Sequence, residues 1–167
     1  VVASRNAFDI WSRFSAYNRG QILYRIAEMM EGRKAQFIEE IILQGINSTT
    51  AKKEINTSID RIIYYAGWAD KINQVFGSIN PIASSHFNFS LFEPMGVVGI
   101  VLPETPSILG LVSMLCPVIL SGNTAVLITS ESAPLSAVTF AEVLLNSDVP
   151  NGCVNILTGK KIELIPH

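Results

Sequence analysis

The feature that most constrains this chain is the absence of Asp, Glu, Lys and Arg between Glu104 and Glu131. A run of this length is sufficient to cross a bilayer, so it predicts either a membrane span or a buried core. Pro106, Pro117 and the polar break at residues 121–124 divide the run into a helix-length piece and a strand-length piece. Neither end of the run is flanked by the cluster of Lys and Arg residues that is typical of a membrane anchor. We therefore expect a buried core and no membrane partner.

Charge and cysteine usage exclude several classes of protein. The chain has 12 basic and 14 acidic residues in 167, a net charge of −2, which leaves no positive field for nucleic acid. Cys116 and Cys153 have no metal-ligand spacing and form no disulfide framework, so we expect buried thiols, no metal site and a cytoplasmic location. Because the chain opens on Val1 without a signal-peptide pattern, we expect it to be part of a longer protein.

The first part of the chain is predicted to be helical. Apolar residues recur there at helical spacing, and Thr49 and Thr50 are placed to cap the third helix. The three apolar blocks are Ile22, Leu23, Ile26, Met29 and Met30; Phe37, Ile38, Ile41 and Ile42; and Ile55, Ile59, Ile62, Ile63 and Ala66. A helix–turn–helix DNA reader is the functional alternative, which the near-neutral charge disfavours.

The pattern changes between Ser78 and Pro94. Residues 86–92 alternate polar and aromatic side chains with a period of two, which predicts a half-buried strand. Two arrangements remain open for this strand. It is either an arm that pairs with a strand outside this chain, such as that of a neighbouring subunit, or one side of a local hairpin.

After Pro94 strands and helices alternate as β-α-β-α-β, which predicts an α/β fold. Continuous apolar strands joined by helical crossovers favour a parallel sheet that is covered on both faces. Ser132 is a candidate N-cap, and Gly122 suits a left-handed helix end. The expected elements are strand Val97–Leu102, helix Ser107–Leu120, strand Ala125–Ile128, helix Pro134–Leu145 and strand Val154–Leu157.

Ligands of such a sheet bind beyond the carboxyl ends of its strands. In this sequence, polar residues come directly after these strand ends. The glycine fingerprint G-x-G-x-x-G is absent after the first strand, as is a Walker-type phosphate loop. Glu131 follows the second strand, and a carboxylate at that place can accept both hydroxyls of a ribose. The alternative is an ordinary solvated acid near a helix N-terminus.

A series of motifs in the second part resembles a known family. They are Glu93-Pro94-Met95-Gly96-Val97-Val98-Gly99-Ile100, Pro103, Gly122-Asn123-Thr124-Ala125-Val126-Leu127, Glu131, Pro134-Leu135-Ser136-Ala137, Val149-Pro150-Asn151-Gly152 and Val154-Asn155-Ile156-Leu157-Thr158-Gly159. In order and spacing they resemble the amino-terminal half of an aldehyde dehydrogenase. Upstream, Trp11, Arg19, Leu23 and residues 65–70 resemble the same family.

The resemblance implies a division of the chain and a reaction. Residues 1–78 would be a helical segment, 79–95 a strand arm for homo-oligomerisation, and 96–167 the first part of a Rossmann-like dinucleotide-binding domain that lacks the usual glycines. The implied activity is oxidation of an aldehyde by NAD or NADP, through attack of a cysteine thiolate and release by a glutamate-activated water. Both catalytic residues would follow His167.

The resemblance also predicts cofactor-site residues in this chain, with two departures from the family pattern. Leu102, Pro103, Glu131 and Gly159 match the expected cofactor-binding positions. Thr105 stands where the family has an asparagine that stabilises the oxyanion, and losing such a donor costs about 3–4 kcal/mol. Ile128 stands where the family has a ribose-binding lysine, and it offers no donor.

Two hypotheses follow from these departures. The first is that the chain is part of an NAD(P)-dependent aldehyde dehydrogenase and contributes to a cofactor site of weakened affinity. The second is a catalytically silent, aldehyde-dehydrogenase-like module with an assembly or regulatory role. The replaced residues favour the second, while the retained Glu131 favours the first.

Overall fold

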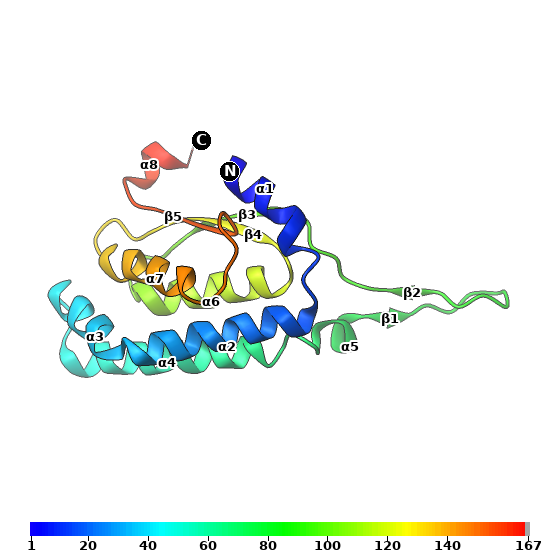
Figure 1. Cartoon of the computed structure of the whole chain (residues 1–167), viewed down its shortest axis with the longest axis horizontal. Helices are drawn as coiled ribbons and strands as arrows, with labels where there is room; N and C mark the ends of the chain where they lie inside the picture. Colours follow the sequence, from blue (N-terminus) through cyan, green and yellow to red (C-terminus); the bar gives the residue numbers. More distant parts are fainter. Residues whose placement is uncertain (166–167) are drawn as a thin grey trace.

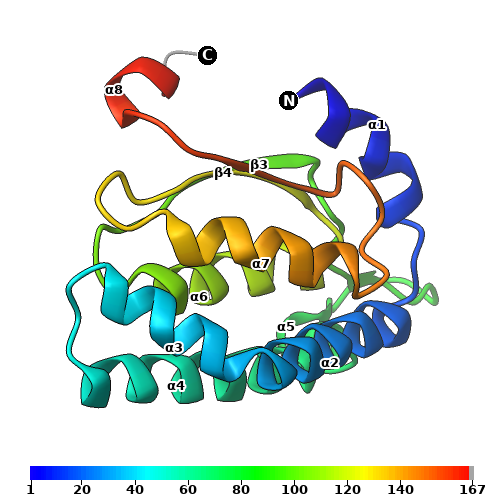
Figure 2. The same ribbon diagram turned by 60° about the vertical axis from the view of Figure 1, so that its left-hand side comes forward.

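The structure is a computed structural model that describes residues 1–165, and its elements stack in layers (Figure 1). A parallel sheet forms one side of the molecule. Helices α6 (Ser107–Leu120) and α7 (Leu135–Leu145) lie beneath it, and α2 (Ala16–Gly32), α3 (Lys34–Leu43) and α4 (Ser48–Ala66) lie beneath those (Figure 2). The hydrophobic core fills the space between these layers. The α/β prediction is confirmed.

The sheet has the predicted parallel topology. Strands β3 (Val97–Val101), β4 (Thr124–Ile128) and β5 (Val154–Leu157) lie in the order β3-β4-β5, and both neighbouring pairs are parallel. The strands and helices expected from the sequence begin and end within one residue of these bounds. The domain predicted from residue 96 extends to residue 167, of which the last two residues lie outside the described part.

Only one face of the sheet is fully covered by the described residues. Helices α6 and α7 cover one face, whereas on the other side α1 (Val2–Trp11) contacts β3 and β4 and Leu164 of α8 (Lys161–Leu164) lines a hollow over the strands (Figure 2). Val101 remains 44% exposed and Leu157 41% exposed. The prediction of a sheet covered on both faces is therefore wrong for residues 1–165. An apolar hollow occupies the open face instead.

Side-chain caps fix the starts of the long helices. The Ser15 hydroxyl accepts a hydrogen bond from the Asn18 backbone N–H at 3.1 Å at the start of α2. At α4 the cap is Asn47, whose side chain accepts from the Thr50 N–H at 2.9 Å. The expectation that Thr49 or Thr50 caps this helix is wrong, because both lie inside its first turn and Asn47 accepts its free donor.

The apolar spacing of the helices explains how they pack. Buried side chains recur every three or four residues along α2 and α4, so each helix buries one face. Helix α1 is tied to the middle layer by a buried hydrogen bond from Trp11 Nε1 to the carbonyl oxygen of Ile119 at 3.0 Å. The core residues of the two long helices are Ile22, Leu23, Ile26, Ala27, Met30, Ala51, Ile55, Ile59, Ile62 and Ala66.

The connections around β4 partly follow the prediction. Gly122 has a φ of +86°, so the expected left-handed helix end is confirmed. Ser132 does not cap α7, because Pro134 occupies the cap position and the helix starts at Leu135. The Ser132 hydroxyl instead donates to Glu104. This hydrogen bond belongs to the edge of the sheet described below.

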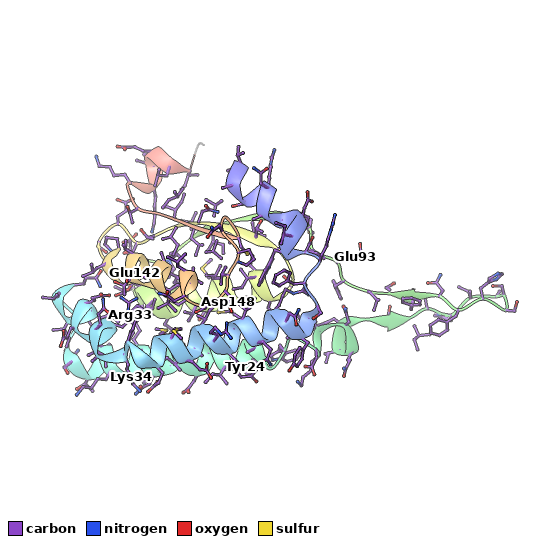
Figure 3. The ribbon with its side chains drawn as sticks, in the orientation of Figure 1. Tyr24, Arg33, Lys34, Glu93, Glu142 and Asp148 are labelled. Carbon is purple, nitrogen blue, oxygen red and sulfur yellow. The ribbon has the colours of Figure 1, made fainter. Side chains whose placement is uncertain are left out.

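A hairpin projects from the layered body (Figure 1). After the short helix α5 (Ile72–Phe76), β1 (Ser78–Ile79) pairs antiparallel with β2 (Phe89–Ser90). The local-hairpin interpretation is confirmed, whereas the prediction of a half-buried strand is wrong. Residues 83–93 are all exposed, and the side chains of the hairpin extend away from the body (Figure 3). Of its aromatic residues, Phe87 and Phe89 lie against each other, whereas Phe92 packs edge-on against Phe76 of α5.

The interpretation of the uncharged run as core is confirmed. No helix among residues 1–165 combines the length and apolarity needed to span a bilayer. The run forms α6 and β4, which contribute Leu111, Leu115 and Leu127 to the core with no measurable exposure. Cys116 and Cys153 are buried as expected.

Candidate functional site

The carboxyl ends of the three strands meet at one edge of the sheet. Val101 pairs with Ile128 in the parallel register, and Ile128 pairs with Leu157. The segments that follow these residues therefore emerge side by side. The sequence-predicted residues 102–105, 128, 131 and 159 all lie on or next to this edge, which we call the carboxyl edge.

Glu104 is the centre of the carboxyl edge. Its Oε2 atom accepts hydrogen bonds from the Ser130 hydroxyl at 2.7 Å and the Ser132 hydroxyl at 2.9 Å. The same oxygen accepts from the backbone N–H groups of Glu131 at 3.0 Å and Ser132 at 3.2 Å. A side chain from the loop after β3 thus binds the whole turn after β4.

Lys161 connects the third strand to this cluster. Its ammonium group forms an ion pair with Glu104 Oε1 and donates to the carbonyl oxygen of Leu102 at 2.8 Å. Its backbone N–H donates to Glu131 Oε1 at 2.7 Å. One residue at the start of α8 (Lys161–Leu164) therefore contacts both of the other strand ends.

The electrostatics of the edge follow from these contacts. The Lys161 ammonium, together with the donors of Ser130 and Ser132, holds the pKa of Glu104 far below its usual range. The Glu104 carboxylate is consequently charged at every pH at which proteins are normally handled. It neutralises Lys161 and accepts hydrogen bonds from the N–H groups of Glu131 and Ser132.

The remaining predicted positions have different environments. Thr105 is exposed on the loop before α6. Pro103 packs closely on that helix, since a Cβ atom added to Gly110 would lie 2.5 Å from Pro103 Cγ. Gly159 has a φ of +147°, a conformation that favours glycine, and lies on the loop after β5.

Ile128 brings no polar group to the edge. Its neighbours Ala125 and Leu127 belong to the core, whereas Ile128 and Val126 line the apolar hollow on the open face of the sheet. Alternation along a strand explains this placement. An isoleucine at position 128 thus extends an apolar surface and supplies no side-chain donor to the carboxyl edge.

Sequence reasoning missed Glu104, Ser130, Ser132 and Lys161. The first three stand at strand ends, the same signal that identified Glu131, and could have been found by it. Lys161 could not have been found in this way, because its contact depends on the backbone of α8 turning back toward the loop after β3. No cluster of His, Cys, Asp or Glu in residues 1–165 could hold a metal ion.

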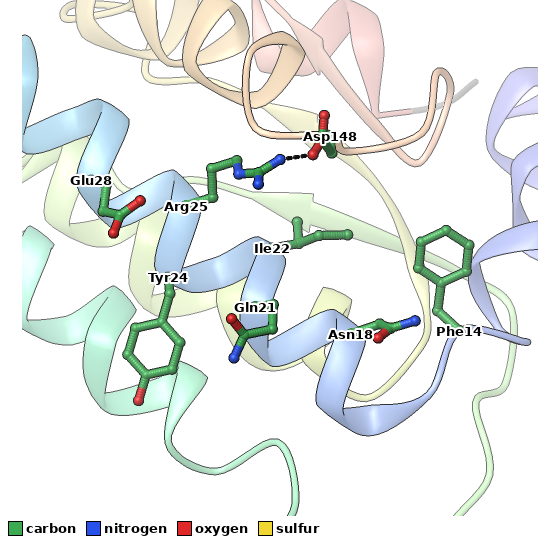
Figure 4. A pocket seen from close by; sticks show the side chains of 8 residues that line it. All are labelled: Phe14, Asn18, Gln21, Ile22, Tyr24, Arg25, Glu28 and Asp148. Carbon is green, nitrogen blue, oxygen red and sulfur yellow. Dashed lines mark ion pairs between the residues drawn. The ribbon is translucent and has the colours of Figure 1, made fainter.

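A second hollow lies on the outer face of α2, away from the carboxyl edge (Figure 4). An ion pair between Arg25 on the helix and Asp148 on the loop before β5 closes one side of it. Its lining is otherwise a mixture of amide, acidic and aromatic side chains. The residues are Phe14, Asn18, Gln21, Ile22, Tyr24, Arg25, Glu28 and Asp148. This arrangement has no convergent donors or acceptors comparable to those around Glu104.

Comparison with known proteins gives a consistent result. The model of the aldehyde dehydrogenase family matches residues 1–165. The chain is 35% identical over 167 residues to cytosolic 10-formyltetrahydrofolate dehydrogenase of Mus musculus, and 32% identical to the mitochondrial enzyme of Homo sapiens. Each match covers 95% of this chain and 18% of the relative.

The fold is shared with solved structures. An aldehyde dehydrogenase of Bacillus cereus, solved as an NAD+ complex, superposes with a TM-score of 0.89 at 28% identity. The match covers 95% of this chain and 33% of that one. The chain therefore spans about a third of that enzyme and corresponds to its amino-terminal, Rossmann-like part. With the match of the family model to almost its whole length, this chain belongs to the aldehyde dehydrogenase family.

Proposed function

We propose that this segment forms one wall of an NAD(P) site in an aldehyde-oxidising protein and that the site binds its cofactor weakly. The carboxyl edge carries the proposal, because it brings Leu102, Glu131 and Gly159 together where parallel sheets hold ligands. NAD(P)+ would accept a hydride from the substrate there. The residues of this chain would only hold and orient it.

The donor set at the edge fits a dinucleotide incompletely. Glu131 accepts from Lys161 through one carboxylate oxygen, and its Oε2 atom would accept a ribose hydroxyl. Ile128 supplies no donor to share that ribose. Because the Leu102 carbonyl and the N–H groups of Glu131 and Ser132 already have partners, a ligand gains few new hydrogen bonds.

The thiols of this segment are unsuited to attack on an aldehyde. Burial raises the pKa of Cys153 to about 12 and that of Cys116 still further. A thiol that stays protonated and buried is a poor nucleophile. The thiolate of the proposed reaction must therefore come from another part of the protein. We expect residues 1–167 alone to oxidise no aldehyde, and NADH production by the purified segment would contradict this.

Titration of the intact natural chain with NAD+ and NADP+ by calorimetry tests the proposal. We expect a Kd on the order of 100 µM or weaker, which corresponds to a binding free energy of about −5.5 kcal/mol or one closer to zero. Glu131→Ala should weaken this further, whereas Glu39→Ala, at an exposed site on α3, should not. Complete absence of binding would reject weak binding of NAD(P)+ by the wild-type protein.

A catalytically silent module is the second candidate, and the closed state of the carboxyl edge favours it. The Glu104–Lys161 ion pair binds the strand ends to one another as a structural cross-link would. Binding at micromolar Kd would count strongly against this candidate. So would steady-state NADH production by the intact protein.

We also propose that the hairpin mediates homo-oligomerisation. Ile79, Phe87 and Phe89 are 73%, 70% and 55% exposed, although they are large and apolar. Sedimentation of the intact natural chain should show an oligomer that Phe87→Ser with Phe89→Ser dissociates. Val2→Ser, at a residue exposed to the same degree on α1, should leave it assembled. A wild-type monomer at high concentration would refute the proposal.

A further inference from the structure

Glu104 faces more donors than its carboxylate can use fully. Its Oε2 atom has four donor contacts within 3.2 Å. One carboxylate oxygen offers about two lone-pair sites, so these donors are shared rather than individually satisfied. Donors in this state keep part of their hydrogen-bonding capacity. An incoming group with several acceptor oxygens would satisfy them better than Glu104 does.

The same two residues occupy the groups that a cofactor would need. The Lys161 side chain donates to the Leu102 carbonyl oxygen, and its backbone N–H donates to one oxygen of Glu131. Glu104 accepts hydrogen bonds from the backbone N–H groups of Glu131 and Ser132 in the turn after β4. The Leu102 carbonyl, one oxygen of Glu131 and the N–H groups of Glu131 and Ser132 thus all have partners that belong to one ion pair.

The ion pair lies where it can open without unfolding the sheet. The Glu104 side chain is 46% exposed and stands on a loop, and Lys161 begins a helix of four residues. Neither belongs to the hydrophobic core. Short exposed elements of this kind open locally at low free-energy cost, whereas the buried strands beside them do not.

We propose that Glu104 and Lys161 form a latch that closes the carboxyl edge from within and sets its affinity for a dinucleotide. The inference rests on the proposed cofactor site and adds the residues that control it. A dinucleotide binds when Glu104 withdraws from the turn after β4 and Lys161 releases Leu102. Its apparent Kd is the intrinsic Kd divided by the fraction of molecules with the latch open.

Glu104→Ala in the intact natural chain tests the latch, with Glu163→Ala as the matched control. Glu163 lies in α8 and pairs with Lys160 at 3.5 Å, so its loss changes the net charge equally and leaves the latch in place. In calorimetric titrations, Glu104→Ala should bind NAD+ about tenfold more tightly, as expected if about one molecule in ten is open. The control should match the wild type.

Thermal denaturation separates the latch from a purely structural role. Glu104→Ala should lower the melting temperature while it raises the affinity, because the ion pair stabilises the closed state. A residue that only supported the fold would lower both. A variant that binds NAD+ no more tightly than the wild type overturns the latch, and weak binding by the wild type then leaves the proposed site standing. If the wild type binds no NAD+ and Glu104→Ala does bind it, the latch is supported. Only the expectation that the wild type binds weakly is then rejected.

Inorganic phosphate provides a second, simpler probe. With the carboxylate removed, the Lys161 ammonium and the N–H groups of Glu131 and Ser132 lose their anionic partner and should accept a phosphate ion. Calorimetry should detect phosphate binding to Glu104→Ala and little to the wild type or to Glu163→Ala. If neither NAD+ nor phosphate binds any of the three proteins, both the latch and the cofactor site are rejected.

Discussion

The carboxylate of Glu54 on α4 accepts a hydrogen bond from the backbone N–H of Ile108, 54 residues further along, at 2.9 Å. The same Oε1 atom accepts from Leu109 N–H at 3.2 Å. Pro106 occupies the cap position of α6 and has no side-chain acceptor to offer. A carboxylate from another helix therefore satisfies the first donors of α6, where the helix dipole also favours negative charge.

Removal of this carboxylate should destabilise the protein. Glu54→Ala leaves two N–H groups of α6 without their acceptor, and we expect a loss of about 2 kcal/mol in the free energy of unfolding. Glu54→Gln keeps an acceptor oxygen and should lose less. Urea denaturation measures the difference, with Glu39→Ala on an exposed face as the control. A Glu54→Ala variant as stable as the control would show that the contact contributes nothing.

The contact between Gly110 and Pro103 supports a second prediction. Alanine is the better helix former, yet its Cβ atom in Gly110→Ala would lie 2.5 Å from Pro103 Cγ. The ring must move, so we expect a loss of about 1–3 kcal/mol. Gly32→Ala, in the last position of α2 with no atom near the new Cβ, should be neutral or stabilising by up to about 1 kcal/mol. Equal denaturation midpoints for the two variants would refute the steric explanation.

The regular elements were predictable from the sequence because each has a strong local cause. The strand Val154–Leu157 and the helix Ser107–Leu120 occur with the predicted bounds. Continuous apolar strands between helices allow few arrangements other than a parallel sheet, and a parallel sheet brings its carboxyl ends together. The location of the candidate site therefore followed from the order of the elements.

The failures arose where tertiary contacts decide the outcome. The cap of α4 is Asn47, two residues before the expected Thr49. Apolar spacing does not define the start of a helix to within two residues. Ser132 was expected to cap α7 but binds Glu104, whose position depends on the neighbouring strand. The ion pair with Lys161 joins residues 57 positions apart. Such contacts carry no local sequence signal.

Burial of the two cysteines predicts their chemical behaviour. Because burial raises the pKa of both thiols, the thiolate fraction at pH 8 is very small in the folded protein. Alkylation by iodoacetamide, read as the mass of the peptides that contain Cys116 and Cys153, should be slow under native conditions and complete in denaturant. Rapid native labelling of either peptide would show that its thiol is accessible.

The lowered pKa of Glu104 predicts how stability depends on pH. Its value in the folded protein lies below the ordinary value of 4.5, so the folded state releases this proton more readily than the unfolded state. The resulting stabilisation is fully present above about pH 4.5 and is lost as the pH falls below it. Melting curves of the wild type and Glu104→Gln should therefore differ by a constant amount from pH 7 to about pH 5.5 and converge on further acidification. Glu163→Gln, which leaves the Glu104–Lys161 pair intact, should keep the acid sensitivity of the wild type. If Glu104→Gln loses stability in acid as steeply as the wild type, this carboxylate is not the group responsible.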